Sequence, residues 1–394
     1  MSSAPTAAPA KLASLLTPAL AAAAENADHV DRNARFPVEC IDALRASGAL
    51  GCYVPVELGG LGASFDDLAD ATFELSRRCA ASGMVFAMHQ IQVATIVHHL
   101  DGSVWYTNYL RRLAKEQRLI GSATSETGVG GDLRSSIAAV ENTSTGVRFE
   151  KKASTISYGA HSDDILTSLR RAPEADKGDQ VMVLTPVSEM EMEPMGEWDP
   201  LGMRGTCSPG FIIRANCLRE QVMPIPFSVM CAETVVPFSH LLWAQVWLGT
   251  AAAAFDRAQS FVRAQARQNP GTVPATAQRL AALSARMAEF RALVKSATAE
   301  YVEAIDSEVP ANREVLSTMG YAVRINNVKL AASEAVVEVC NAALRICGFL
   351  GYKNGTPYSV GRQLRDGHSA AIMIANDRIL NTNASLLLVH REGK

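Results

Sequence analysis

The chain has 394 residues, enough for a large core and two or three structural units. Its composition, 48% hydrophobic and 20% charged, is typical of a globular protein. The formal net charge of −3 provides no basic field, which argues against nucleic acid or an anionic membrane as a partner. No run reaches the ~20 apolar residues of a membrane span. The eight cysteines include no CxxC pair, so we expect reduced thiols and a cytoplasmic protein.

Residues 11–118 are expected to form an N-terminal helical domain. The stretch 36–48, "FPVECIDALRASG", has apolar residues at helical spacing and ends at a glycine. A glycine-rich turn follows, and residues 65–100 then fit two helices that are separated near Gly83.

Residues 119–235 change in character and are expected to form a small β domain, either a barrel or a sandwich. Short β-prone runs are broken there by Gly, Pro, Asn and Asp, which favour turns. The runs are 137–140, 146–150, 180–187 and 210–218.

From residue 236 to residue 394 the helical period returns, and four long stretches indicate a C-terminal four-helix bundle. The stretches are 238–268, 274–305, 313–348 and 358–390, the last with a break near residue 367. The fold class expected for the whole chain is therefore α+β, mainly α.

Three strings in this order resemble the acyl-CoA dehydrogenase family, and the resemblance covers roughly residues 20–390. The first is 36–62, "FPVECIDALRASGALGCYVPVELGGLG", which follows the family's F-P-x-E, G-x-x-G and P-x-x-x-G-G-x-G pattern. The second is 123–132, "ATSETGVGGD", against the family's A-x-T-E-P-x-A-G-S-D. The third is 198–208, "WDPLGMRGTCS", which matches W-x-x-x-G-M-R-x-T-x-S and for which we expect a mainly structural role.

The resemblance implies an FAD cofactor whose ring contacts the loop 123–132. In the family this loop lays backbone amides and a hydroxyl against the flavin, and small residues let the backbone approach the ligand. The ring-binding residues implied in this chain are Ala123, Ser125, Gly130, Thr155 and Ser157, with Thr155 in place of the family's aromatic residue. The later part of the loop meets the substrate in the family, which makes Gly131 a substrate-binding candidate.

Arg267 and Gln278 correspond to family residues that hold the FAD pyrophosphate. Arginine suits this role because its guanidinium bonds two phosphate oxygens at once. Gly348, in "RICGFLGY", and Asn376 are further cofactor-binding candidates by the same resemblance. In the family the arginine segment reaches the FAD of a neighbouring subunit, so the resemblance implies a homotetramer or homodimer.

The family's catalytic glutamate is missing from its expected place. Counting from the Arg365-Asp366 pair puts that glutamate on Ile374, whose side chain cannot accept a proton. The backbone N–H of Ile374 could still donate a hydrogen bond, because that group does not depend on the side chain.

Two residues are candidates for a relocated base. Some family members place the base on the first helix of the C-terminal domain, which corresponds to Ser239 or His240 in this chain, and a histidine can act as a base near neutral pH. Asp377 follows Ile374 by three residues, and in a helix the two would share a face. Ser239 and His89 are also substrate-binding candidates, His89 because the corresponding helix lines the acyl cavity in the family.

Three hypotheses about function remain open, and none of them needs a metal. The first is α,β-dehydrogenation of an acyl thioester such as an acyl-CoA, with a relocated or absent base and an electron-transfer flavoprotein as a possible acceptor. The second is a monooxygenase of the same fold that uses O₂ and reduced flavin from a flavin reductase. Such relatives commonly carry a histidine near the lost glutamate, where this chain has Met373. The third is a flavin-binding homologue without activity.

Overall fold

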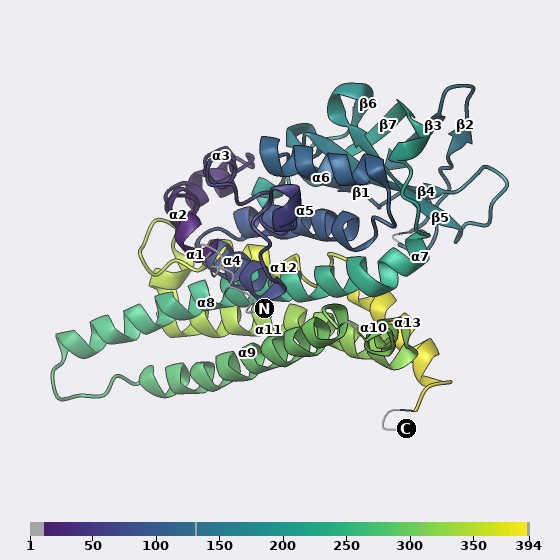
Figure 1. Cartoon of the computed structure of the whole chain (residues 1–394). Coiled ribbons are helices and arrows are strands. Elements are labelled where there is room, and N and C mark those ends of the chain that lie inside the picture. The colour runs from purple at the N-terminus through teal and green to yellow at the C-terminus, as the bar shows by residue number, and fades with distance from the viewer. Residues whose placement is uncertain (1–11, 131, 308, 392–394) are drawn as a thin grey trace, which may run out of the picture.

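The chain folds as helices, then strands, then helices, in a computed structural model that describes residues 12–130, 132–307 and 309–391 (Figure 1). The expected α+β, mainly α, fold class is confirmed. The N-terminal helices pack against α8, and α5 is buried on nearly every side because it is apolar all round. These helices are α1 (Leu12–Leu15), α2 (Thr17–Arg32), α3 (Val38–Ala46), α4 (Phe65–Arg78), α5 (Ala80–His98) and α6 (Val104–Glu116).

The strands lie between the two helical parts and form two small sheets. The first sheet has the order β1-β4-β5 with β1 parallel to β4, and the second has the order β2-β3-β7-β6 and is antiparallel. Their facing side chains form a core of their own, separate from the main helical core. The strands are β1 (Ile120–Ala123), β2 (Glu141–Asn142), β3 (Val147–Ala153), β4 (Asp164–Arg170), β5 (Gln180–Pro186), β6 (Met190–Met195) and β7 (Gly210–Cys217).

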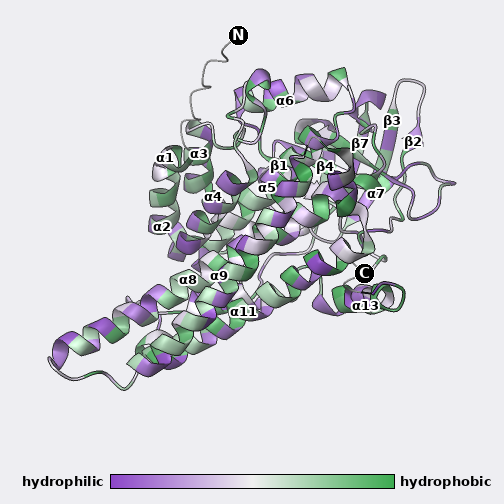
Figure 2. Cartoon of the chain, turned by 60° about the horizontal axis from the view of Figure 1, so that its bottom comes forward, coloured by the Kyte–Doolittle hydropathy of each residue, from purple (hydrophilic) through white to green (hydrophobic). Residues whose placement is uncertain are grey.

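The C-terminal part is built on three long helices that lie side by side (Figure 1). A short helix and one π-helical turn, Cys231–Val235, lead directly into the first of them. The α8–α9 hairpin projects beyond the rest of the chain, and Figure 2 shows hydrophilic residues along its far end. The helices are α7 (Phe227–Met230), α8 (Val236–Gln268), α9 (Ala277–Ile305), α10 (Pro310–Glu314), α11 (Met319–Tyr352), α12 (Gly361–His368) and α13 (Asn376–Leu387).

The break expected in the last helical stretch is confirmed, since α12 ends at His368 and α13 begins at Asn376. Ile374 lies in the turn between them with a left-handed φ of 50°. The expectation that Ile374 and Asp377 share a helical face is therefore wrong, because Ile374 is not in a helix.

Three helices in the described part of the chain are long and apolar enough to cross a membrane, by length and composition alone. They are α5, the continuous helix Phe227–Gln268 and α11, and their most apolar windows are 89%, 72% and 44% buried inside the protein. The expectation that no segment reaches that length was wrong. Core packing accounts for the apolar character of the first two helices.

The string 198–208 joins the three parts of the chain, which confirms its structural role. Arg204 donates to the carbonyl oxygen of Asp31 at 2.8 Å, and Arg365 donates to the Asp31 carboxylate at 2.8 Å. The N–H of Met203 donates to the carboxylate of Asp366 at 2.7 Å, and burial raises the pKa of Asp366 to about 6. The Arg365-Asp366 pair thus fixes α12 against α2 and the middle domain. The turn that contains Ile374 comes directly after this fixed helix in the chain.

Candidate active site

The loop that follows β1 is held by a buried glutamate. Glu126 is 5% exposed and accepts hydrogen bonds from the Ser136 hydroxyl at 2.7 Å and from the N–H of Ala138 at 2.7 Å. Because these bonds occupy its carboxylate, Glu126 has a structural role. Ala123, the last residue of β1, is fully buried, so it can offer a ligand only its backbone.

Two hydroxyl residues connect this loop to the segment after β3. The Ser125 hydroxyl donates to the carbonyl oxygen of Thr155 at 2.8 Å and accepts the Thr155 N–H at 3.1 Å. Thr155 is exposed and Ser125 is half-buried. The structure therefore brings together two of the residues expected at the flavin ring.

Ser157 is held by the string 198–208 through Ser208. The Ser208 hydroxyl donates to the Ser157 hydroxyl at 2.9 Å, and Thr206 and Ser208 lie 2.9 Å apart through their side-chain oxygens. Since Ser157 is the acceptor in its bond with Ser208, its own proton stays available for an acceptor on a ligand. Ser157 is half-buried, so part of its side chain is open to a ligand.

Gly130 and Arg378 bring the loop and α13 into contact. Gly130 has a φ of +60°, and a Cβ atom on it would lie 2.8 Å from the Arg378 guanidinium. Glycine adopts this backbone shape without strain and lets the Arg378 side chain approach closely. Gly131, the substrate-binding candidate, lies outside the described residues.

Ile374, the position that the resemblance assigns to the family's glutamate, lies in the turn just before α13. Ile374 is 37% exposed, and its carbonyl oxygen accepts a hydrogen bond from the amine of Lys329 at 2.7 Å. The same amine donates to the side-chain oxygen of Asn376 at 2.6 Å, and the Asn376 amide donates to the Ser333 hydroxyl at 3.0 Å. Asn376 is thus engaged by α11, so a cofactor would meet a side chain whose orientation is already set.

Two basic residues at this site carry no motif that would single them out in the sequence. Lys329 is the single charged residue in the stretch 325–333, and this is the one signal in the sequence that points to it. Burial lowers the pKa of Lys329 to about 8, so most molecules still carry the charge at pH 7. Arg378 is found only through its contact with Gly130, which sequence spacing does not reveal.

His240 lies inside the bundle near the start of α8. It is 3% exposed, and its Nδ1 has no hydrogen-bond partner in the part of the chain that the structure describes. Burial, together with the nearby charge of Lys329, lowers the pKa of His240 to about 3. The imidazole is therefore neutral at pH 7 and can accept a proton at Nδ1, although only weakly. Ser239 is also buried, at 5% exposure.

Asp377 and His89, the other two candidates from the sequence, are less suitably placed to contact a substrate. Asp377 is exposed in the first turn of α13. His89 is fully buried, and its ring nitrogens contact the carbonyl oxygen of Leu50 at 2.8 Å and the N–H of Ile120 at 3.0 Å. Both nitrogens of His89 are used by the backbone, so the structure corrects the expected substrate contact to a role in the core.

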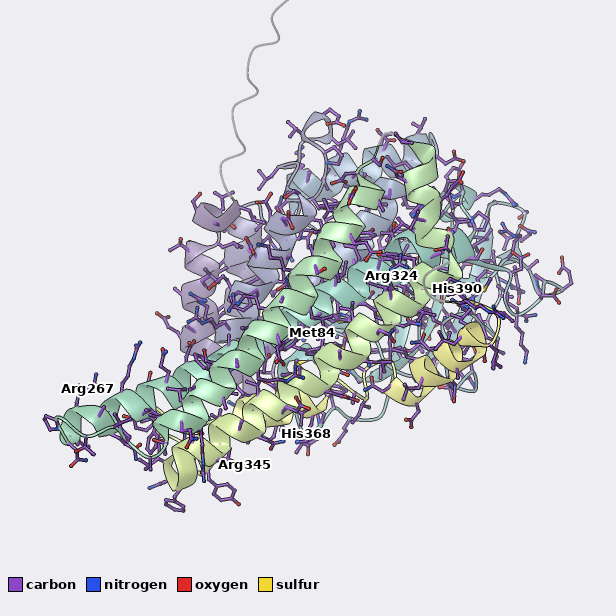
Figure 3. All side chains as sticks on the ribbon, turned by 90° about the horizontal axis from the view of Figure 1, so that it is seen from below. Met84, Arg267, Arg324, Arg345, His368 and His390 are labelled. Carbon is purple, nitrogen blue, oxygen red and sulfur yellow. The ribbon has the colours of Figure 1, made fainter. Side chains whose placement is uncertain are left out.

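The residues expected at the pyrophosphate lie at the opposite end of the bundle from the middle domain. Arg267 is exposed at the projecting end of α8 (Figure 3). Gln278 is exposed at the start of α9. Figure 1 shows this end of α8 and the strands of the middle domain on opposite sides of the molecule.

A groove between α9 and α11 lies near that end of the bundle. It has a volume of about 490 Å³ and is lined by Arg279, Arg286 and Arg345 among others. Arg286 is paired with Glu338 at 2.8 Å, while Arg345 is exposed on the face seen in Figure 3. Gly348 has φ 56° and ψ −138°, a shape that glycine alone adopts readily, and it kinks α11 beside this groove. These arginines and the glycine suit a phosphate-bearing ligand.

Comparisons with known proteins agree with this architecture. The family models described as "Acyl-CoA dehydrogenase, N-terminal domain" and "Acyl-CoA dehydrogenase, C-terminal domain" match residues 18–117 and 232–379. A dibenzothiophene monooxygenase of Mycolicibacterium goodii is 25% identical over 336 residues, which cover 78% of this chain and 77% of the relative. The probable acyl-CoA dehydrogenase YngJ of Bacillus subtilis is 24% identical over 353 residues, 87% of each chain.

A solved structure also shares the fold. FMN-bound TdsC from Paenibacillus sp. A11-2 superposes with a TM-score of 0.80 at 20% identity, over 96% of this chain and 98% of that one. The relatives thus include dehydrogenases and monooxygenases, and a flavin cofactor, FAD in the family, goes with both. The chain belongs to the acyl-CoA dehydrogenase family of flavin-dependent oxidoreductases.

Proposed function

We propose that the protein is a flavin-dependent monooxygenase that uses reduced flavin and O₂ to oxygenate a small organic compound. The observation that carries this proposal is the hydrocarbon side chain of Ile374 at the place of the family's base, with the nearest acid along the chain, Asp377, exposed to solvent. Removal of a weakly acidic α-proton needs a well-placed base, whereas oxygen transfer does not. The similarity to dibenzothiophene monooxygenases supports the same choice.

In this reaction the bound reduced flavin supplies two electrons, so that one oxygen atom of O₂ enters the substrate and the other leaves as water. The chain's own residues hold and shield the reacting groups. Ser157, backed by Ser208, offers a hydroxyl proton at the flavin edge, and the Ser125–Thr155 pair fixes the neighbouring backbone. Ile374 presents an apolar surface at the vacated position, which helps to keep water away from a reactive centre.

The second half of the cofactor is proposed to lie on a neighbouring subunit. Arg267 and Gln278, with Gly348 and the arginines of the α9–α11 groove, fit the phosphates and adenylate half of FAD. Each chain would then bind its own flavin ring near the middle domain and the phosphates of a partner's flavin at the far end of its bundle. This arrangement supports a homodimer or homotetramer.

Dehydrogenation of an acyl thioester is the second candidate, and the unpartnered Nδ1 of His240 is the observation that favours it. In that reaction His240 would take the α-proton while the β-hydride passes to the bound flavin. The depressed pKa of His240 makes it a weak base, and its burial requires the substrate to reach into the bundle. For these two reasons it ranks below oxygenation.

Spectra of the purified protein test both proposals. A flavin-loaded sample that consumes O₂ only when a flavin reductase supplies reduced flavin, and transfers oxygen to an organic sulfide or an aromatic ring, supports the monooxygenase. Anaerobic bleaching of the flavin by a panel of acyl-CoA esters supports the dehydrogenase and contradicts the first proposal. A protein that binds neither FAD nor FMN contradicts both.

A further inference from the structure

Lys329 is a buried lysine near the middle of α11 that bonds to the turn before α13. Its side chain is 0% exposed, and its amine donates to Ile374 and Asn376 oxygens at 2.7 and 2.6 Å. Within the described ranges, the amine has no carboxylate partner. Burial of an unpaired ammonium group is unfavourable, so the two oxygens of the turn are what offsets it.

The turn that Lys329 contacts has an unfavourable backbone conformation. Ile374 has a φ of 50°, which is rare for a β-branched side chain. Its own N–H donates to no residue in the described segments, so the turn gains little from Ile374 itself. Such a conformation persists only when its surroundings impose it. Lys329 bonds the carbonyl oxygen of Ile374 directly, and Ser333 holds Asn376 two residues further on.

The turn also sets where α13 begins. Asn376 starts α13, and its N–H donates to the carbonyl oxygen of Ala371 at 2.9 Å. Two residues later Arg378 lies against Gly130 in the loop after β1. A shift of the turn would therefore move the contact between α13 and that loop, because both depend on the same first residues of the helix.

We propose that Lys329 is a positioning residue for the flavin site: it holds the turn 369–376 in its left-handed form and thereby seats α13 against the loop 123–130. The inference rests on the proposed function in one respect, since it takes the turn and the loop as two walls of that site. Lys329 itself touches no substrate, because it is buried behind Ile374.

A role in core packing alone makes a different prediction. Lys329 also lies over the ring of Trp247 at 5.7 Å, so its loss could simply loosen α11 against α8. The two roles separate through Ile374, because glycine adopts a φ of 50° without strain. If the Lys329 hydrogen bonds are needed to impose that φ, they should no longer be needed once Ile374 is replaced by glycine. If Lys329 only fills the core, Lys329→Met should have the same effect with and without Ile374→Gly.

The experiment compares Lys329→Met, Ile374→Gly and the double variant in the full-length chain, with Lys295→Met as the matched control. Lys295 is an exposed lysine on α9. Amide hydrogen exchange is measured in the flavin-free protein over 369–378, and affinity is measured by titration with FMN and with FAD. Because exchange needs neither flavin nor substrate, a failure of the proposed function would leave this part of the result intact.

We expect Lys329→Met to speed exchange in 369–378 at least tenfold and to weaken flavin binding about tenfold, with little change in the control. We expect Ile374→Gly to restore most of both losses in the double variant. Unchanged exchange in Lys329→Met overturns the proposal. The proposal is also overturned if Lys329→Met speeds exchange across all of α8 and α11 and Ile374→Gly does not reverse this. If Lys329→Met does not fold, Asn376→Ala removes one of the two acceptors, and the same comparison with and without Ile374→Gly decides the matter.

Discussion

The amine of Lys329 lies 2.7 Å from the carbonyl oxygen of Ile374, so the vacated base position is tied directly to the central helix of the bundle. The same lysine lowers the pKa of His240 through its charge, after the larger effect of burial. One side chain on α11 thus influences both places where a base could stand.

The Ser157 hydroxyl is expected to contribute to flavin binding. Ser157→Ala removes a donor that is oriented by Ser208, and a hydrogen bond of this kind is worth about 1 kcal/mol. We therefore expect a roughly fivefold higher flavin dissociation constant, measured by absorbance titration, with an unchanged melting temperature. Ser154→Ala, at an exposed serine three residues earlier, is the control and should bind flavin like the parent protein. Equal affinities for the Ser157 and Ser154 variants would mean that the flavin does not use this hydroxyl.

Helical periodicity predicts most of the architecture, because long helices bury one stripe of apolar residues and leave a clear period. The stretches 36–48 and 274–305 correspond to α3 and α9. Strand β4 carries no such signal, because it is buried on both faces and its residues do not alternate. Its polar members, such as Asp164, look like loop residues until their partners are known.

The candidate site is harder to predict than the fold, because its contacts join residues far apart in the chain. The resemblance groups Ser125, Thr155 and Ser157, and the structure joins the first two by hydrogen bonds. Nothing local in the sequence indicates that Lys329 reaches Ile374, or that both nitrogens of His89 serve the backbone. Those facts depend on how α11 and α5 pack.

Arg267 is expected to bind the phosphates of FAD on a neighbouring subunit. A charge-assisted hydrogen bond is worth about 1.5–3 kcal/mol, so Arg267→Ala should raise the FAD dissociation constant at least tenfold. FMN lacks the adenylate half and should be affected much less. Size-exclusion chromatography should also show a shift toward smaller species. Arg263→Ala, one turn earlier and equally exposed, is the control. Full FAD occupancy in Arg267→Ala would show that the pyrophosphate lies elsewhere.

His240 is expected to make the folded protein sensitive to acid. Its pKa is lowered from about 6.5 in the unfolded chain to about 3 in the folded one. Between these values the unfolded state binds more protons, so the stability present above pH 6.5 is lost as the pH falls toward 3. At pH 5 the loss from this residue amounts to about 2 kcal/mol.

His240→Asn tests this coupling through a difference between two pH values. Whatever the substitution costs at pH 7.5, it should cost about 2 kcal/mol less at pH 5, because asparagine has no proton to take up. Urea unfolding of both proteins at the two pH values gives the comparison. Lys329, the charge named beside His240, stays mostly protonated in this range. A cost that is equal at both pH values would place His240 in contact with water in the folded protein.

Restoring a carboxylate at residue 374 should reveal whether that position still faces the reacting carbon. Glutamate there would lie next to the charge held by Lys329, which keeps it ionised and able to accept a proton. If the site admits an acyl thioester, Ile374→Glu should bleach its flavin anaerobically with acyl-CoA about 100-fold faster than Ile374→Gln, since a positioned base contributes about that much. Stopped-flow absorbance at the flavin band measures the rates. The glutamine variant matches the size and shape of glutamate, so any difference comes from the ability to take a proton. Equal rates in the two variants would mean that residue 374 no longer faces a substrate α-carbon, and would leave oxygen transfer as the chemistry that this geometry supports.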